Sequence, residues 1–404
     1  MQNGGRLWIS RLKPISLRMA IFTMMTNQVY HSDVAIPPGE YLAEVLAARQ
    51  ISQAELSRRM GRPEQALNEI IKGSKAITPE TAIQLEQVLG VPAHIWTGME
   101  SEYQLVRARA KEARQAAGET GLLEEISYSH LVKMGVVRAV RDGAEKIDEL
   151  KKFFGVAALE NLQQVKAYRP AFRVAEKRKA SPYALAAWLR CGELKASGMA
   201  AKPYSKEGLE HALEEIRRLT NEPPETFEPA LKSLLAECGV ALVILPHLPK
   251  TYAHGATFWL KDKAVLMMSI RGSWADIFWF SLFHELAHIL LHDKRATFIE
   301  DGNSDPEVGK QEDEASQFAT DNLIPRTRHD DFVAAPVHTA SAIRAFAQEL
   351  GIHGGIVVGR LQHDGVIPQR TPLNALRMRL KWKAVKRPVN PGRDQGGACV
   401  SRGH

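Results

Sequence analysis

The strongest chemical signal in the sequence is a histidine and a glutamate followed, three residues later, by a second histidine. This HExxH pattern lies in the run DIFWFSLFHELAHILLH at 276–292 and consists of His284, Glu285 and His288. Residues four apart lie on one face of a helix, so both imidazoles can bind a single tetrahedral Zn²⁺. Glu285 then lies beside the metal, where its carboxylate can take a proton from an attacking water. The spacing predicts a zinc-dependent hydrolytic site.

The residues around this motif are apolar on nearly every face, which predicts a buried helix. Two imidazoles and a carboxylate are expensive to bury without partners, whereas a metal and its hydrogen-bonded surroundings satisfy all three. His292 extends the series by four more residues, but two helical turns separate it from His284. We therefore do not expect His292 to be a metal ligand.

A third ligand must come from elsewhere, and the run QEDEASQFATDNLIP at 311–325 is the best source. A helix over this run buries a stripe of apolar side chains: Ala315, Phe318, Ala319 and Leu323. Glu312 lies on the side of this stripe, whereas Glu314 is turned further toward solvent. We favour Glu312 over Glu314 as the third ligand.

The region from Tyr183 through Trp382 resembles the ImmA/IrrE family of metallopeptidases, which is gluzincin-like. The similarity is carried by AWLRCGELKA, CGVALVILPHLP, GATFWL, FWFSLFHELAHILLH, EDEASQFATDNLIP and GIHGGIVVGRLQHDG. The resemblance implies an α+β peptidase domain with a small sheet, a bound Zn²⁺ and a downstream glutamate ligand, for which Glu312 is again favoured. It also implies a protein substrate, a repressor or antitoxin, which is either a partner or this chain's own DNA-binding domain.

The runs VALVILP and AVLMMSI are typical of strands beside such a helix. Peptidases of this kind can bind an extended substrate by strand addition, and we expect Thr257–Leu260 to be the edge that receives it. An oxyanion donor is also required, but the sequence leaves Tyr252, His254 and Arg271 open as alternatives.

The N-terminal part of the chain contains helix-capping signals. Ser52 followed by Glu55 forms a capping box, which predicts a helix from Gln53 that ends at Gly61. Another helix is predicted from about Pro63 to Lys72, and Thr78 before Pro79 predicts the start of the next. Short helices with a glycine turn between the second and third are the arrangement that places one helix in the DNA major groove.

The run SQAELSRRMGRPEQALNEIIKG resembles the XRE, or lambda-repressor-like, helix-turn-helix, and its flanking segments resemble the HigA-type antitoxins. By that resemblance Gln53 contacts phosphate, whereas Gln65 and Asn68 read base edges. Lys72 lies on the same outward face and is counted with them as a DNA contact. The expected partner is duplex DNA, bound by a homodimer.

Length and composition limit the possible domain organisation and partners of the chain. The chain has 404 residues, a net charge of +7 and only three cysteines, which fits two or three globular domains, an anionic partner and a reducing cytoplasm. No apolar run is long enough for a membrane span. The expected organisation is a disordered extension (1–30), a helix-turn-helix domain (31–112), a helical connector (113–180), a zinc metallopeptidase core (181–330), its C-terminal helical part (331–382) and a basic disordered tail (383–404).

Together these features predict a multi-domain chain, with an all-α DNA-binding domain and an α+β zinc endopeptidase domain that couples proteolysis to transcription. The alternative is a DNA-binding regulator or antitoxin whose peptidase-like domain senses a ligand or partner without proteolysis. An intact Glu285 favours catalysis, because a purely structural zinc site does not need a nearby carboxylate.

Overall fold

The computed structural model describes residues 35–169, 171, 180–292, 298–299, 306–335, 338–382 and 400–402. The chain divides between Gln115 and Ala116 into two compact units. The predicted extension at 1–30 and most of the predicted tail lie outside the described residues. Within the described part of the chain, no helix is both long and apolar enough to cross a bilayer.

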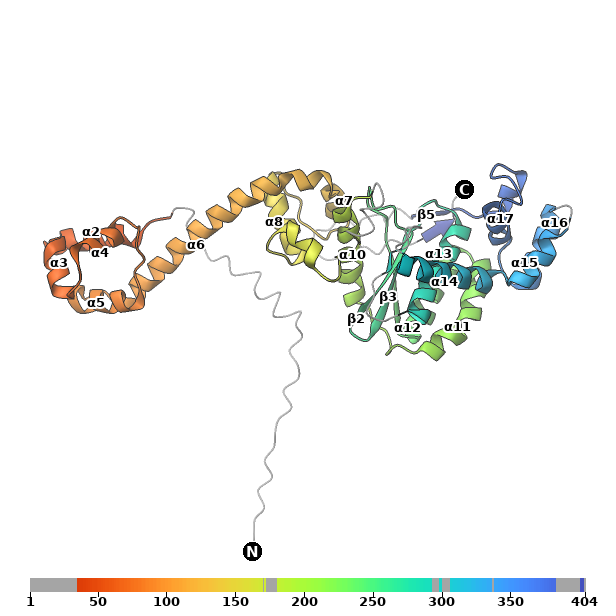
Figure 1. Ribbon diagram of the computed structural model, residues 1–404, viewed down its shortest axis with the longest axis horizontal. Helices are drawn as coiled ribbons and strands as arrows, with labels where there is room; N and C mark the ends of the chain where they lie inside the picture. The colour runs from red at the N-terminus through yellow and green to blue at the C-terminus, as the bar shows by residue number, and fades with distance from the viewer. Residues whose placement is uncertain are drawn as a thin grey trace, which may run out of the picture. The chain divides into compact units, whose positions relative to one another are not determined.

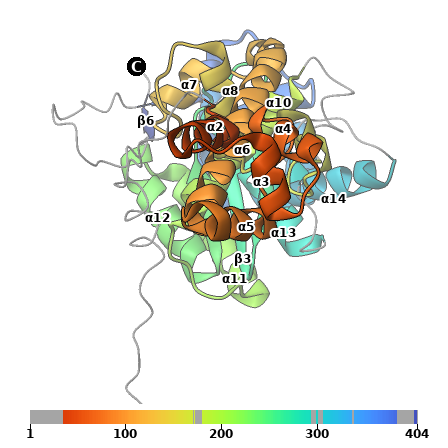
Figure 2. The same ribbon diagram turned by 90° about the vertical axis from the view of Figure 1, so that its left-hand side faces the viewer.

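The first unit is built from short helices around one apolar core (Figures 1 and 2). The helices are α2 (Pro38–Arg49), α3 (Gln53–Met60), α4 (Glu64–Ile71), α5 (Pro79–Leu89) and the first part of α6 (Ala93–Gly118). The side chains of Ser52 and Thr78 cap α3 and α5, and Gly61 ends α3 in the left-handed region at φ 63°. The capping box is only half formed, because Glu55 pairs with Arg58 and Arg59.

The second unit is organised by a small mixed sheet with strand order β1-β3-β2-β4. Its strands are β1 (Val240–Ile244), β2 (Gly255–Leu260), β3 (Lys263–Met268) and β4 (Phe298–Ile299). Strand β3 pairs in parallel with β1 and antiparallel with β2. Strand β4 covers only Ala256 and Thr257 of β2, so Phe258–Leu260 have no strand partner on that side among the described residues. Within the part of the chain that the structure describes, the predicted edge at Thr257–Leu260 is therefore unpaired only from Phe258 onward.

Helices pack on both faces of the sheet, because its side chains alternate between two apolar cores. One face meets α8 (Gly143–Phe154) and α10 (Pro182–Ser197), accompanied by η1 (Glu119–Glu124), α7 (Tyr128–Lys133) and η2 (Leu159–Gln164). Gly192 lets α10 approach β3, since a Cβ there would overlap the side chain of Met267. The segment predicted as a connector at 113–180 thus supplies one wall of the second unit's core.

The other face of the sheet carries the helices that hold the predicted chemistry. They are α11 (Lys206–Arg218), α12 (Pro224–Glu237), α13 (Ala275–Leu291), α14 (Pro306–Leu323), α15 (Arg326–Val333), α16 (Ala340–Leu350) and α17 (Gly354–His363), with short turns η3 (Leu219–Asn221) and η4 (Pro372–Leu376). Figure 1 shows α13 and α14 side by side, in agreement with their extensive contact.

The C-terminal segment departs from the prediction of a disordered tail over 383–404. Val400–Arg402 form strand β6, which pairs antiparallel with β5 (Leu380–Trp382). The physical reason is that β5 offers backbone donors and acceptors that a second strand satisfies. Residues 383–399 lie outside the described residues.

Candidate metal centre

The HExxH residues lie on α13, a helix buried almost along its whole length. His284 is 3% exposed, Glu285 0% and His288 2%. Their neighbours Phe283, Leu286 and Ala287 are also buried, so the polar residues are enclosed by apolar ones. Burying imidazoles and a carboxylate in this way costs free energy unless hydrogen bonds or a bound cation satisfy them.

Helix α14 brings Glu312 to the two histidines. Its small residues Ala315 and Ala319 are fully buried, which lets α14 lie close against α13. Glu312 Oε2 lies 3.0 Å from His284 Nε2, and Glu312 Oε1 lies 3.4 Å from His288 Nε2. The two Nε2 atoms are 3.1 Å apart. Glu314 is not part of this group and lies instead beside His292, with 3.3 Å between Glu314 Oε2 and His292 Nε2.

These donor atoms fit a zinc ion. Two atoms bonded to one tetrahedral zinc at about 2.0–2.1 Å lie about 3.3 Å from each other. The three separations among His284, His288 and Glu312 run from 3.0 to 3.4 Å, close to this value. Two imidazoles and one carboxylate are also a ligand set that leaves a fourth position open, as catalytic zinc sites do.

The protonation states also suit a cation. Burial lowers the pKa of His288, which keeps its imidazole neutral and able to offer a lone pair. Burial would raise the pKa of Glu312, but hydrogen bonds with His284 and His288 outweigh this effect and lower the pKa to about 2. Glu312 is therefore ionised at neutral pH.

Glu285 is held between α13 and the sheet. Gly255, the first residue of β2, lies directly against it, because a Cβ built on Gly255 would be 2.6 Å from Glu285 Cγ and 2.6 Å from Oε1. The absence of a side chain at this glycine thus makes room for the carboxylate. The sequence pattern identified Glu285, but it gave no sign that Gly255 adjoins it.

The predicted DNA-contacting residues lie in the first unit. Gln65 and Lys72 are exposed, on α4 and at its C-terminal cap, whereas Asn68 and Gln53 are half-buried. Gln65 Nε2 donates to Glu69 Oε1 at 3.2 Å along the same helix. The outward face of α4 therefore carries Gln65, Asn68 and Lys72.

Comparisons with known proteins match two parts of the chain. Residues 42–96 match a helix-turn-helix family, and residues 276–361 match the IrrE N-terminal-like domain of the M78 peptidases. The uncharacterized HTH-type transcriptional regulator YddM of Escherichia coli (strain K12) is 30% identical over 71 residues, which are 18% of this chain and 76% of that protein. The chain belongs to the HTH-type transcriptional regulators. It also carries an IrrE N-terminal-like domain, so both predicted resemblances and the predicted fold class are confirmed.

Two solved structures are also similar to part of this HTH-type regulator. An addiction module antidote protein of the HigA family from Coxiella burnetii is 28% identical, covers 21% of this chain and 94% of its own, and has a TM-score of 0.20. The Pseudomonas aeruginosa antitoxin HigA, solved with the higBA promoter, is 32% identical, covers 20% of this chain and 90% of its own, and has a TM-score of 0.20.

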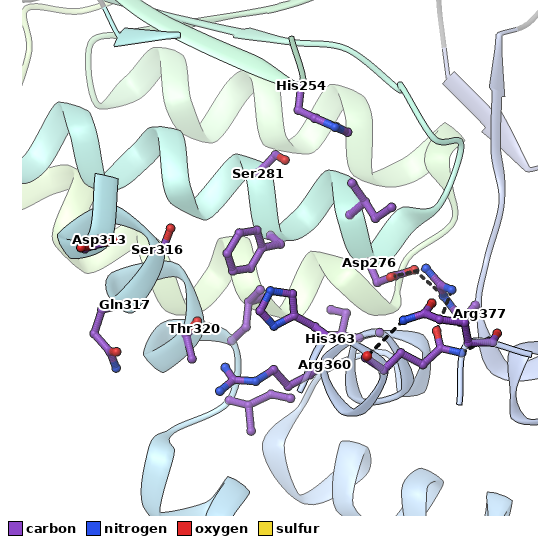
Figure 3. Close-up of a pocket in the computed structure, with 18 residues that line it drawn as sticks. His254, Asp276, Ser281, Asp313, Ser316, Gln317, Thr320, Arg360, His363 and Arg377 are labelled. Carbon is purple, nitrogen blue, oxygen red and sulfur yellow. Dashed lines mark hydrogen bonds and ion pairs between the residues drawn. The ribbon is translucent and has the colours of Figure 1, made fainter. Parts of the chain in front are cut away.

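A cavity of about 790 Å³ adjoins the metal-site residues of the IrrE-like domain. Figure 3 shows Ser281 of α13, Ser316 of α14 and His363 of α17 around it. Ser316 connects the cavity to the metal centre, because its Oγ lies 3.4 Å from His284 Nδ1. The apolar part of the lining consists of Ile277, Phe280, Leu323, Ile324 and Ile356.

The three alternatives for an oxyanion donor lie close to one another. Arg271 Nη1 donates to the backbone carbonyl of Tyr252 at 2.6 Å and lies 3.4 Å from His254 Nε2. The guanidinium of Arg271 also lies over the Tyr252 ring, 5.0 Å from its centre. His254 is the member of this group that lines the cavity, at the end where β2 begins.

Proposed function

We propose that this regulator is a zinc-dependent endopeptidase that cleaves a repressor or antitoxin, either a partner or its own helix-turn-helix unit. The observation that carries the proposal is the near-tetrahedral spacing of His284, His288 and Glu312 beside the buried Glu285. A purely structural zinc site takes four protein ligands. Among the described residues, three candidate protein ligands are grouped next to a carboxylate suited to proton transfer.

In this proposal His284, His288 and Glu312 hold the ion. When bound, zinc supplies Lewis acidity, which polarises a peptide carbonyl and makes water more acidic. The Glu285 carboxylate accepts a proton from the attacking water and then donates it to the leaving amine nitrogen, so the same side chain acts as base and acid. Its enclosure between α13 and Gly255 keeps the carboxylate oriented through both transfers.

The substrate main chain has a place to bind beside this centre. Among the described residues, Phe258–Leu260 of β2 have no strand partner on the side beyond β4, and in this proposal an extended peptide adds there as a strand. The cavity next to Ser316 then receives one substrate side chain. Because Ile277, Phe280 and Ile356 line it, we expect a large apolar side chain near the scissile bond.

The direct test is a cleavage assay with the purified full-length chain. We expect zinc-loaded protein to release fragments from a helix-turn-helix repressor or antitoxin, or from itself, as detected by mass spectrometry, and a zinc chelator to stop the reaction. If no such substrate is cleaved while the regulator still responds to its inducing signal, the alternative function applies, in which the IrrE-like domain senses a ligand or partner.

The metal site makes a separate prediction. Replacing His288 with alanine is expected to lower bound zinc from about one per chain to none, because two ligands do not hold the ion against dialysis. Glu314→Ala is expected to keep the metal at saturating zinc, since Glu314 stands outside the cluster. His363→Ala is the matched control, because this histidine's side chain is 84% exposed. Elemental analysis that finds wild-type zinc in His288→Ala would refute the ligand set.

We also propose that α4 of a homodimer binds duplex DNA. Asn68→Ala is expected to reduce discrimination between operator and unrelated DNA by about 1–3 kcal/mol, because an amide can pair with two atoms of adenine. Lys72→Ala is expected to weaken binding to every DNA sequence. The slope of log K against log salt concentration should also become less steep by about one. Lys206→Ala in the second unit is the control.

Gel retardation or fluorescence anisotropy across a range of salt concentrations measures both effects. Wild-type affinity should fall steeply as salt rises, because basic contacts release counterions from DNA. If the full-length chain retards no genomic DNA at low salt, the first unit is instead a protein-binding module.

A further inference from the structure

His292 lies at the C-terminal end of α13 and continues the face that carries His284 and His288. Its side chain is only 3% exposed, although the residue follows the last helical position. His292 Nδ1 lies 2.9 Å from His288 Nδ1, and the two rings are 5.0 Å apart between their centres. This buried imidazole therefore touches the ring of a metal-site histidine on the side away from the cluster.

The positions of the ring nitrogens determine where the protons lie. His288 turns Nε2 toward Glu312 and His284, so Nε2 must carry the lone pair in order to bind a metal. The proton of a neutral His288 is then on Nδ1, which donates to Nδ1 of His292. A neutral His292 that accepts at Nδ1 carries its own proton on Nε2.

Glu314 completes this arrangement from α14. Its Oε2 lies 3.3 Å from His292 Nε2 and accepts the remaining proton, while Lys310 Nζ lies 3.8 Å from Oε1. The side chain of Glu314 is 47% exposed, so its carboxylate reaches His292 from the solvent side of α14. Each donor in the chain from His288 through His292 to Glu314 thus faces one acceptor.

We propose that His292 and Glu314 are positioning residues that fix the tautomer and ring orientation of His288, so that its Nε2 is directed at the metal. The inference rests on the proposed metal site and assigns two residues that are not ligands a role in metal affinity. Residues that hydrogen-bond a metal-binding histidine commonly change metal affinity by about 10–100-fold when they are replaced. His284 has a different outer contact, Ser316.

The test compares full-length variants by competition with a zinc chelator. His292→Phe keeps a ring of similar shape but removes both nitrogens, and we expect zinc affinity to fall by about 10–100-fold. His292→Asn places an amide oxygen close to the position of Nδ1, so the variant retains an acceptor for His288 and should bind zinc more tightly than His292→Phe. Glu314→Ala should weaken binding less than His292→Phe, because it leaves the direct contact to His288 intact.

A second readout separates positioning from packing. Cobalt(II) reports ligand geometry through its visible absorption spectrum, and we expect His292→Phe to change this spectrum while His292→Asn stays close to wild type. The inference is overturned if His292→Phe binds zinc as tightly as wild type, or if His292→Asn is as weak as His292→Phe. A wild-type chain that binds no metal overturns the proposed function as well, whereas a metal-loaded wild type with unaffected variants overturns this inference alone.

Discussion

Replacing Glu285 with glutamine is expected to reduce peptide cleavage by about 10²–10⁴-fold, the range that one general acid–base group contributes. Glutamine has the shape of glutamate but cannot accept a proton from the attacking water. The isosteric change matters here, because Gly255 leaves no room for a larger side chain beside Glu285. Bound zinc and the thermal unfolding midpoint should stay close to wild type, since Glu285 is outside the ligand cluster.

The measurement is a time course of substrate cleavage with equal amounts of zinc-loaded wild type and variant. Glu207→Gln on α11 is a matched control, because it makes the same chemical change at an exposed position of the same unit. Cleavage at the wild-type rate by Glu285→Gln would show that Glu285 does not transfer the proton in peptide cleavage. If wild type releases no fragment of any DNA-binding partner and Glu285→Gln still responds to the inducing signal, the ligand-sensing regulator becomes the better description.

The sequence predicts the structure best where local chemistry determines it. The four-residue spacing of His284 and His288 requires only a helix to bring the imidazoles together, and the apolar stripe beside Glu312 was enough to orient that residue. The same holds for Ser52 and Thr78, whose caps act within one turn. The grouping of His284, His288 and Glu312 therefore needed little long-range information beyond the packing of α14 on α13.

Sequence reasoning was less successful where a residue's role depends on distant partners. The helices at 116–171 contain ordinary amphipathic patterns, and nothing local shows that they cover the second face of the sheet. Likewise, His292 was set aside as a ligand, but its four-residue spacing from His288 was already a signal that the two rings touch. Arg377 begins a basic run that continues to Arg402, and because such a run is normally solvated, the sequence predicts that its side chain is exposed.

The structure corrects this interpretation of Arg377, whose side chain is 9% exposed and forms a bidentate ion pair with Asp276 in the first turn of α13. Arg377 Nε and Nη2 lie 3.0 and 2.6 Å from the two carboxylate oxygens, and Nη1 donates to Gln362 Oε1 at 2.9 Å. The backbone of Gly359 makes room for Asp276. This pair fixes the start of the helix that carries the HExxH residues.

Arg377→Met is therefore expected to lower the free energy of unfolding by about 3–5 kcal/mol, because it leaves Asp276 buried and unpaired. Adding Asp276→Asn should restore part of this loss by removing the charge. Burial already raises the pKa of Asp276. In the variant without Arg377, the Asp276 carboxylate of the folded state should therefore take up a proton more readily than it does in the unfolded chain. The stability difference from wild type should therefore narrow as the pH falls.

Denaturant titration at several pH values measures these differences, and Arg379→Met is the control. Arg379 also lies over the Trp274 ring, 3.9 Å from its centre compared with 4.2 Å for Arg377, but its side chain is exposed. Its replacement should therefore change stability by less than about 1 kcal/mol. Two outcomes would show that the charge pair is not what holds α13 in place: equal losses in the two arginine variants, or a double variant less stable than Arg377→Met alone. In that case the packing of long side chains on Trp274 would account for the buried position of Arg377.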